Sequence, residues 1–434
     1  MRKIQFIFFL LLFSCLEKEP EVEEKLPEVN LSTAYASSNS EVEVTGSLLA
    51  SDLNEEVEYG IVWAETTSPT IENQKNTISK INRGTRFNAK ISTLKSGSKI
   101  FVRAFVKNIK NEIKYSNEIE VIVETSKIWK KLGDLEFDEG QFTGVATKLD
   151  DQNLTFLRLN QYNEWEQFKH YNGSSYNNNY TWMKEKFSFP QFSPRQEPFF
   201  FTLNLSKDFT RPTAFLGGGF ASQTNAKIYL KDMYWVYDNQ NYLDPLPLGD
   251  GPIAYFSLNR NAYLLEENNT DKFWSYFSLE QFIKRQPFPK IGPNFDFLGA
   301  ATKTKGYILA ENKNEKEVQL FEYDDIKDKW TQKKSFPGNG RIDGVFFSLK
   351  NKIYYGLGRN SKPVKGLSDI WEYDPATDHW KFITNYPGAG NIAVMASEMG
   401  EYTLIYCGYQ VRASEANAEK YYNANDTWMF RLTN

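Results

Sequence analysis

Apolar and polar residues alternate with a period of two through much of the chain, which is the pattern of strands that bury one face. Between residues 27 and 125 the alternation is clearest in four segments, Glu41–Gly46, Glu58–Trp63, Lys99–Val106 and Glu118–Val123. Several short strands separated by turn residues over roughly 100 residues are typical of a β-sandwich. We therefore predict a small all-β domain over residues 27–125.

From Ile128 onward the pattern repeats about every 50 residues, a period that indicates a propeller. The frame is clearest at Trp330 and Trp380, which lie 50 positions apart and each follow an acidic-aromatic segment. In each unit the sequence predicts four strands. The first strand is apolar, the second is flanked by glycine, the third is acidic and aromatic, and the fourth begins with Trp. The predicted first strands of six units are Phe142–Lys148, Pro198–Leu203, Ile253–Leu258, Phe297–Lys303, Asp343–Leu349 and Asn391–Ser397.

The two ends of this repeat region complement each other. Asp426–Leu432 reads as a third strand with no fourth strand after it, and Ile128–Leu132 reads as a fourth strand with no unit before it. We predict that the strand of Trp129 completes the C-terminal unit and closes the ring, because closure removes exposed sheet edges. The early units are degenerate, so seven blades are the alternative to six.

Composition supports an all-β protein and excludes several classes of function. Aromatic residues make up 16% of the 434 residues, and such residues are enriched in strands. The net charge is −4, whereas nucleic-acid binders carry a basic surface. Two His and two Cys are too few for a zinc site of these ligands, because His170 and His379 are far apart in the chain.

The first residues have the pattern of a targeting signal. Arg2 and Lys3 precede the apolar stretch Ile4–Phe13, which is too short to span a membrane as a helix. Ser14-Cys15 after this stretch resembles the bacterial lipoprotein lipobox, and the resemblance implies cleavage before Cys15 and lipidation of Cys15. An ordinary secretory signal is the alternative.

The segment after Cys15 is acidic and contains Pro20, which predicts a solvated tether over residues 15–26. It resembles the surface-export signal of Bacteroidota lipoproteins. We therefore expect an outer-membrane, lipid-anchored protein that faces the cell exterior, with an inward-facing anchor as the alternative.

Two further resemblances set the expected fold class. Tyr59–Trp63 and Val102–Asn108 are similar to the fibronectin type III-like modules of Bacteroidota surface proteins, and the repeat around Trp330 and Trp380 resembles the kelch repeat. Together they imply an all-β chain: a fibronectin type III/Ig-like sandwich followed by a six-bladed kelch-type β-propeller. The expected domains are a signal peptide (1–14), a tether (15–26), the sandwich (27–125) and the propeller (128–434).

The sequence contains few candidates for catalysis. Phosphate-binding loops, zinc-protease motifs and nucleophile elbows are absent from it. We expect His170 and His379 to be solvated and Cys407 to be a buried structural thiol, which argues against the copper site of the kelch-like radical oxidases. We predict neither a cofactor nor a metal.

Two loops have the composition of a ligand-binding surface. The segment Gly173–Trp182 combines Tyr176, Tyr180 and Trp182 with several Asn residues, and such rings stack on sugars. Arg412 and Tyr421 lie in a second long segment. Alternatively, Trp182 is a core residue that replaces a missing repeat Trp.

We therefore predict that the propeller binds a glycan or a surface protein without catalysis. The alternative is a carbohydrate-active enzyme such as a sugar mutarotase, in which Arg341, Arg359 and Glu139 or Asp343 would be candidate groups at the propeller mouth. For Arg341, a structural ion pair is the competing interpretation.

Overall fold

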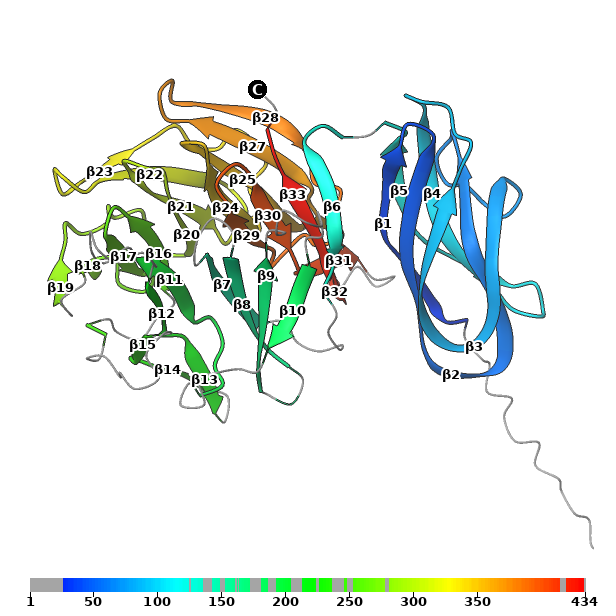
Figure 1. Ribbon diagram of the computed structural model, residues 1–434, viewed down its shortest axis with the longest axis horizontal. Coiled ribbons are helices and arrows are strands. Elements are labelled where there is room, and N and C mark those ends of the chain that lie inside the picture. The colour runs from blue at the N-terminus through cyan, green and yellow to red at the C-terminus, as the bar shows by residue number, and fades with distance from the viewer. Residues whose placement is uncertain are drawn as a thin grey trace, which may run out of the picture. The chain divides into compact units, whose positions relative to one another are not determined.

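The computed structural model is all-β, with 33 strands and no helix among the residues that it describes (Figure 1). Within those residues, no helix has the length and apolar character needed to cross a membrane. The described residues are 26–124, 126–135, 143–148, 153–160, 162, 164–171, 181–185, 193–203, 213–223, 226–235, 246–247, 253–277, 281–413 and 419–432. Cys15, the predicted signal peptide and all but the last residue of the predicted tether therefore lie outside the described residues.

The chain forms two compact units. The first comprises Met1–Leu31, Thr45–Ala89 and Lys99–Glu120, and the second comprises Ser32–Val44, Lys90–Ser98 and Val121–Asn434. The described part of the first unit belongs to one N-terminal sheet of five strands, in the order β1-β2-β4-β5 with β3 paired to β2. Its strands are β1 (Glu28–Ser38), β2 (Glu41–Ala64), β3 (Gln74–Ile91), β4 (Lys99–Lys107) and β5 (Ile113–Ile122).

The predicted strands of this region are present, with one correction. Glu41–Gly46 and Glu58–Trp63 are two parts of the single strand β2. The prediction of two strands was wrong because the alternation continues between them, with Leu48 and Val57 both buried. A long strand can then pair with different neighbours along its length, and Glu58–Ala64 pairs with β4.

Six further sheets follow, and we number them in chain order. Each is antiparallel, and four of the six are described with four strands. The first sheet is β7 (Thr143–Lys148), β8 (Asn153–Leu159), β9 (Trp165–Tyr171) and β10 (Thr181–Glu185); the second is β11 (Phe199–Leu203), β12 (Thr213–Gly217) and β15 (Met233–Trp235), beside the hairpin β13 (Phe220–Gln223) and β14 (Ala226–Tyr229). The third is β16 (Ile253–Leu258), β17 (Asn261–Glu266), β18 (Phe273–Phe277) and β19 (Gln281–Lys284); the fourth is β20 (Phe295–Ala301), β21 (Gly306–Asn312), β22 (Val318–Asp324) and β23 (Lys329–Gln332).

The last two sheets have additional elements. The fifth is β24 (Ile342–Leu349), β25 (Lys352–Ser361), β27 (Asp369–Asp374) and β28 (His379–Asn385), with β26 (Val364–Gly366) paired to β25. The sixth is β29 (Met395–Glu398), β30 (Thr403–Tyr406), β33 (Asp426–Phe430) and β6 (Trp129–Asp134), and the hairpin β31 (Tyr409–Ala413) and β32 (Glu419–Asn423) lies between β30 and β33 in the chain.

The pairing of β6 with β33 joins two segments at opposite ends of the repeat region. Phe430 pairs with Trp129, so the predicted pairing of the Trp129 strand with the C-terminal unit is confirmed. The Trp129 ring lies 4.9 Å from the Phe430 ring and 5.3 Å from the Tyr386 ring, and its Nε1 donates to Thr384 Oγ1 at 3.2 Å. One Trp therefore holds β6 to its own sheet and to the fifth sheet.

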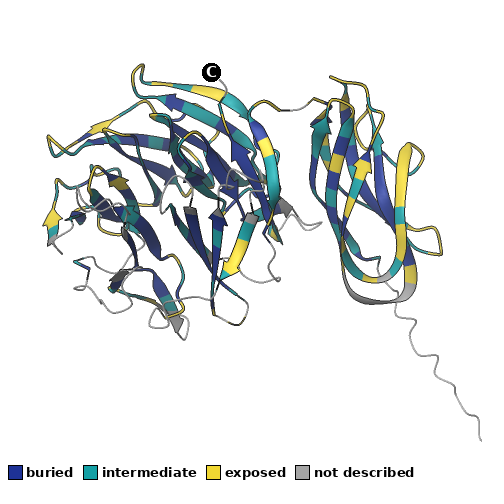
Figure 2. Cartoon of the chain, in the orientation of Figure 1, coloured by how far each residue is buried: buried dark blue, intermediate teal, exposed yellow. Residues whose placement is uncertain are grey.

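The first strands of the six sheets lie next to one another. In chain order the neighbours are β7 and β11, β11 and β16, β16 and β20, β20 and β24, β24 and β29, and finally β29 and β7. In the third to fifth sheets, the first strands alternate between buried and more accessible residues, the second strands are mostly buried, and the fourth strands β23 and β28 are largely exposed (Figure 2). Side chains from all six first strands therefore gather in one central region.

Trp129→Ala should lower the free energy of unfolding by about 3–5 kcal/mol, because truncation of a buried Trp removes apolar contacts and leaves a cavity. The exposed Ile326→Ala, at a side chain 90% accessible, is the matched control and should change stability little. Urea denaturation measures both. An unchanged midpoint for Trp129→Ala would contradict the role of this ring.

Candidate functional site

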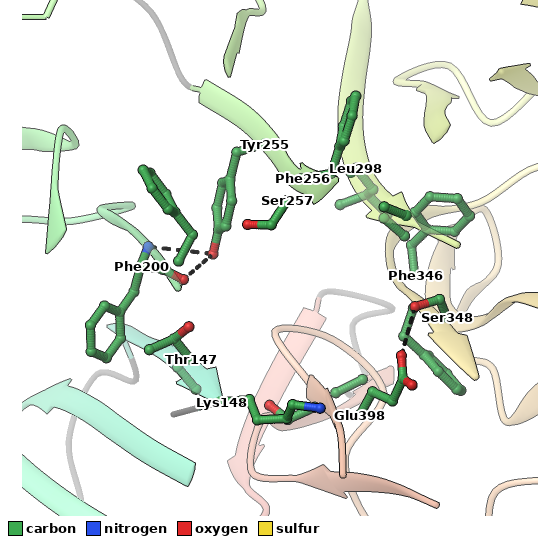
Figure 3. Close-up of a pocket in the computed structure, with 18 of the residues that line it drawn as sticks. Thr147, Lys148, Phe200, Tyr255, Phe256, Ser257, Leu298, Phe346, Ser348 and Glu398 are labelled. Atoms are coloured by element: carbon green, nitrogen blue, oxygen red, sulfur yellow. Dashed lines mark hydrogen bonds between the residues drawn. The ribbon is translucent and has the colours of Figure 1, made fainter. Parts of the chain in front are cut away.

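A cavity of about 800 Å³ lies where the six first strands meet. Residues from all six strands line it, including Thr147, Phe200, Tyr255, Leu298, Phe346 and Glu398 (Figure 3). The cavity arises because alternate residues of each first strand point away from the packed faces, so every sheet contributes a few side chains.

The polar groups of this cavity come chiefly from the C-terminal ends of the first strands. Lys148 ends β7 and Glu398 ends the neighbouring β29. Ser348 Oγ donates to Glu398 Oε2 at 3.0 Å, and the hydroxyls of Thr147 and Thr202 are 2.8 Å apart. Ser257 is exposed and adds another hydroxyl to the wall. The described residues of the wall therefore offer one cation, one carboxylate and several hydroxyls.

The apolar part of the wall is held rigid by Tyr255. Its hydroxyl donates to Phe200 O at 3.3 Å and lies 3.5 Å from Phe200 N, which fixes the ring across the gap between the second and third sheets (Figure 3). Burial raises the pKa of Tyr255, so this phenol stays neutral. Leu298 and Phe346 add apolar surface to the wall, and Phe346 lies beside Ser348 (Figure 3).

A second group of ionisable residues lies at the opposite ends of these sheets. Glu267 follows β17, and burial together with the nearby charge of Asp296 raises its pKa to about 8. Glu311 is fully buried, and burial raises its pKa to about 7 although Tyr355 Oη donates to Glu311 Oε1 at 2.6 Å and Gly344 N at 3.0 Å. Lys313 Nζ lies 2.7 Å from Asp296 Oδ1. Glu267 and Glu311 can therefore exchange protons near neutral pH.

This group continues onto the fifth and sixth sheets. Arg359 Nε donates to Asp343 Oδ2 at 2.8 Å, and Arg359 also pairs with Glu419 of β32. Glu419 in turn accepts a hydrogen bond from Tyr421. Among the described residues, no three His, Cys, Asp or Glu side chains are grouped in a way that could hold a metal ion.

Of the five residues that the sequence proposed for ligand binding, the structure describes the side chains of Trp182 and Tyr421. Tyr176 and Tyr180 lie outside the described residues, as does the side chain of Arg412. Tyr421 is 49% exposed and packs against Tyr409 at 6.2 Å between ring centroids. These ligand contacts stay predictions.

Trp182 lies between two sheets. Its ring is 5.1 Å from Tyr406 and 5.0 Å from His170, and its Nε1 donates to Thr427 Oγ1 at 2.9 Å. It thereby joins β10 of the first sheet to β30 and β33 of the sixth. This location is the one expected from the alternative interpretation of Trp182 as a core residue.

Three other expectations have clear outcomes. The prediction of a solvated His170 was wrong: the residue is 0% exposed, and burial lowers its pKa to about 4. His379 is exposed and Cys407 is buried, as expected. Arg341 is buried and pairs with Asp369, which supports the structural interpretation of this residue over a catalytic one. Glu139 lies outside the described residues.

Sequence reasoning missed Lys148, Glu398, Glu267 and Glu311. Lys148 ends the predicted strand Phe142–Lys148, and Glu398 directly follows the predicted strand Asn391–Ser397, which overlaps β29 only in part. A search for charged residues where first strands finish would have found both. Glu311 had no such signal, since its burial results from Tyr355 and Gly344 of the next sheet.

No family model and no curated protein matches the chain. Among solved structures, YjhT is 14% identical over 66% of this chain and 93% of that chain, with a TM-score of 0.48. An auxiliary nutrient binding protein from Bacteroides ovatus is 10% identical, covering 92% and 97%, with a TM-score of 0.35. AztD from Citrobacter koseri is 10% identical, covering 81% and 89%, with a TM-score of 0.35. With TM-scores below 0.5, these likenesses assign neither a family nor a function.

Glu311→Gln should make stability less dependent on pH. The raised pKa means that the folded state holds a proton that the unfolded state releases, so this group destabilises the fold as pH rises from about 4.5 towards 7. A neutral amide retains the acceptor for Tyr355, and it removes the loss of stability with rising pH because it does not titrate. Unfolding free energies at pH 5 and pH 8 measure the change, with the exposed Glu317→Gln as control. An unaltered pH profile for Glu311→Gln would contradict the raised pKa.

Proposed function

We propose that residues 128–434 form a closed six-bladed β-propeller of the kelch type. The cyclic adjacency of six first strands and the pairing of β6 with β33 support this architecture. The recurrence of an inter-sheet Trp also supports it, because Trp330 Nε1 donates to Gln286 O and Trp380 Nε1 to Lys334 O, each in the connection from the preceding sheet. The N-terminal sheet would belong to a fibronectin type III-like module that acts as a spacer.

We propose that this propeller binds a glycan-sized ligand in its central cavity without catalysis. The cavity volume carries the proposal, because about 800 Å³ lies within the usual range for small-molecule sites. A wall that combines hydroxyls, Lys148 and Glu398 with the apolar groups Tyr255, Leu298 and Phe346 suits a sugar, which has polar edges and apolar C–H faces. A surface protein, the other predicted partner, would need a broad face rather than a central cavity.

One observation favours the catalytic alternative. Glu267 and Glu311 have pKa values raised into the range in which a carboxyl group works as a general acid or base. Both lie at the sheet ends away from Lys148 and Glu398. A carbohydrate-active enzyme would use them only if its substrate reached that end of the propeller.

We propose further that the protein is anchored to the outer membrane by a lipid on Cys15 and faces the cell exterior. The support is the sequence of residues 1–26. Cys15→Ala should release the protein from the membrane fraction, because a lipid chain supplies most of such an anchor's affinity. Fractionation and protease accessibility of intact cells measure anchoring and exposure. Retention of the Cys15→Ala variant with the outer membrane would contradict lipidation.

Ser257→Trp should weaken glycan binding at least about tenfold, because the larger ring fills the cavity, and tenfold corresponds to about 1.4 kcal/mol. A glycan array with the chain from residue 26 identifies the ligand, and calorimetry then gives the affinities. Ala376→Trp, in the exposed turn between β27 and β28, is the control for the added ring and should bind as the parent does.

Two results would contradict binding in this cavity. One is an unchanged affinity for Ser257→Trp with an unchanged melting temperature. The other is turnover, seen by NMR as conversion of the bound sugar, which would establish the catalytic alternative; loss of that turnover in Glu267→Gln would assign it to the second group of residues.

A further inference from the structure

A buried Arg–Asp pair recurs in two of the six sheets. In the fifth sheet Arg341 Nη1 donates to Asp369 Oδ1 at 2.5 Å and to Leu357 O at 3.0 Å, and its Nη2 donates to Asp369 Oδ2 at 2.8 Å. In the second sheet Arg195 binds Asp232 in the same way, and its Nη1 donates to Gly218 O at 3.1 Å. One guanidinium nitrogen in each sheet therefore lies between a carboxylate and a main-chain carbonyl.

The main chain adopts an unusual conformation to present this carbonyl. Leu357 and Gly358 have φ values of 55° and 80°, and Gly218 and Gly219 have values of 60° and 79°. Two consecutive residues in the left-handed region are unfavourable for a side chain such as Leu. The bond from the arginine compensates for this cost.

The sixth sheet has the same backbone without the arginine. Cys407 and Gly408 have φ values of 60° and 109°, so the carbonyl of Cys407 is the equivalent of that of Leu357. Asp426 is the equivalent of Asp369, since Trp428 Nε1 donates to Asp426 Oδ2 at 2.5 Å as Trp371 Nε1 does to Asp369 Oδ2 at 2.7 Å. At the position of Arg341 the sixth sheet has Asn391, whose Nδ2 instead donates to Leu367 O.

The carboxylate of the sixth sheet consequently lacks the guanidinium that Asp369 has. Burial raises the pKa of Asp426 and the charge of Lys131 opposes that rise, but Lys131 Nζ lies 3.4 Å from Asp134 Oδ1 and makes no hydrogen bond to Asp426 Oδ1. Asp426 is 5% exposed, and within the described part of the chain nothing donates to its Oδ1, the atom that Nη1 contacts in the fifth sheet. Tyr386 is 3% exposed, and its hydroxyl likewise has no partner there. The two groups converge, because a Cβ on Gly388 would collide with both Tyr386 Oη and Asp426 Oδ2.

We propose that the sixth sheet binds a small monovalent cation at Asp426 Oδ1, where the second and fifth sheets place a guanidinium nitrogen. The donors are all oxygens: the carboxylate of Asp426, the carbonyl of Cys407 and the hydroxyl of Tyr386. Hard cations prefer such donors, and a single carboxylate matches one positive charge. The opposite pKa shifts of the two carboxyl groups agree with this site, since burial raises the pKa of Asp426 whereas Arg341 outweighs burial and lowers that of Asp369.

The location makes the cation structural. Asp426 begins β33, the strand that pairs with β6. A cation that binds the folded protein and not the unfolded chain stabilises the sixth sheet in proportion to its occupancy. This site does not depend on the proposed ligand in the central cavity.

Melting temperatures in different chloride salts test the proposal. At equal ionic strength, potassium, sodium or ammonium should raise the melting temperature above that in tetramethylammonium by about 2–5 °C, with saturation. Tetramethylammonium is too large for the site. The same melting temperature in all four salts, as expected for a bound water only, would overturn the proposal.

Matched variants separate this site from a general salt effect. Asp426→Asn should lose the difference between salts, while the amide oxygen still accepts from Trp428 and from Ala389 N. Asp369→Asn, at the equivalent position beside an arginine, should keep the difference. An Asp426→Asn variant that retains it would refute the site.

A milder variant covers the case in which Asp426→Asn does not fold. Tyr386→Phe introduces the residue that the fifth sheet has as Phe336, so the core should accept it. It should raise the cation concentration needed for half-maximal stabilisation by about three- to tenfold, as expected for loss of one ligand. An unchanged concentration would exclude Tyr386 from the site. Crystals grown in rubidium chloride should show anomalous scattering beside Asp426 Oδ1, and its absence there would overturn the proposal.

Discussion

The packing of aromatic rings between successive sheets is the interaction on which the rest of the repeat region depends. Each sheet is narrow, so its faces are buried only where the next sheet covers them. Trp330 lies 4.9 Å from Phe273 of the third sheet and 5.0 Å from Phe288 in the connection that follows it. Trp380 repeats this arrangement one sheet later, at 5.4 Å from Phe336. These rings fix the spacing between sheets, and that spacing decides how far apart the first strands lie and how large the central cavity is.

The all-β class and the positions of the first strands were predictable from the sequence because this packing is periodic. Trp330 and Trp380 mark the frame, and the six predicted first strands overlap β7, β11, β16, β20, β24 and β29. The role of Trp129 was predictable for the same reason. Its strand matches the fourth strand of a unit but has no unit before it, and the C-terminal unit has no fourth strand of its own. Where the 50-residue repeat is less regular, the residues next to a side chain do not predict its burial. His170 follows charged and polar neighbours, yet Trp182 from β10 covers it, and nothing within a few residues of His170 indicates that contact.

The candidate site was far less predictable than the fold. Ring-rich composition directed attention to Tyr176, Tyr180 and Trp182, but one of these rings has a structural partner in Thr427, 245 positions away. The residues that line the cavity carry a weaker signal, because Thr147, Ser257 and Ser348 are ordinary strand residues until six strands converge. Glu311 shows the same limit: its pKa depends on burial by another sheet, which no pattern around residue 311 encodes.

The two ends of the sheets consequently differ in chemistry. In each sheet the start of the first strand and the end of the second lie at the same end, because the strands are antiparallel. Glu267, Asp296, Glu311 and Asp343 all occur at that end, whereas Lys148, Ser348 and Glu398 occur where first strands finish. Glu267 and Glu311, whose pKa values are raised to about 8 and about 7, are thus separated from the groups suited to hold a polar ligand. A ligand held by Lys148 and Glu398 alone would be insensitive to the protonation of Glu311, whereas one that spans the first strands would couple binding to it, since ligand and proton would then share one electrostatic environment.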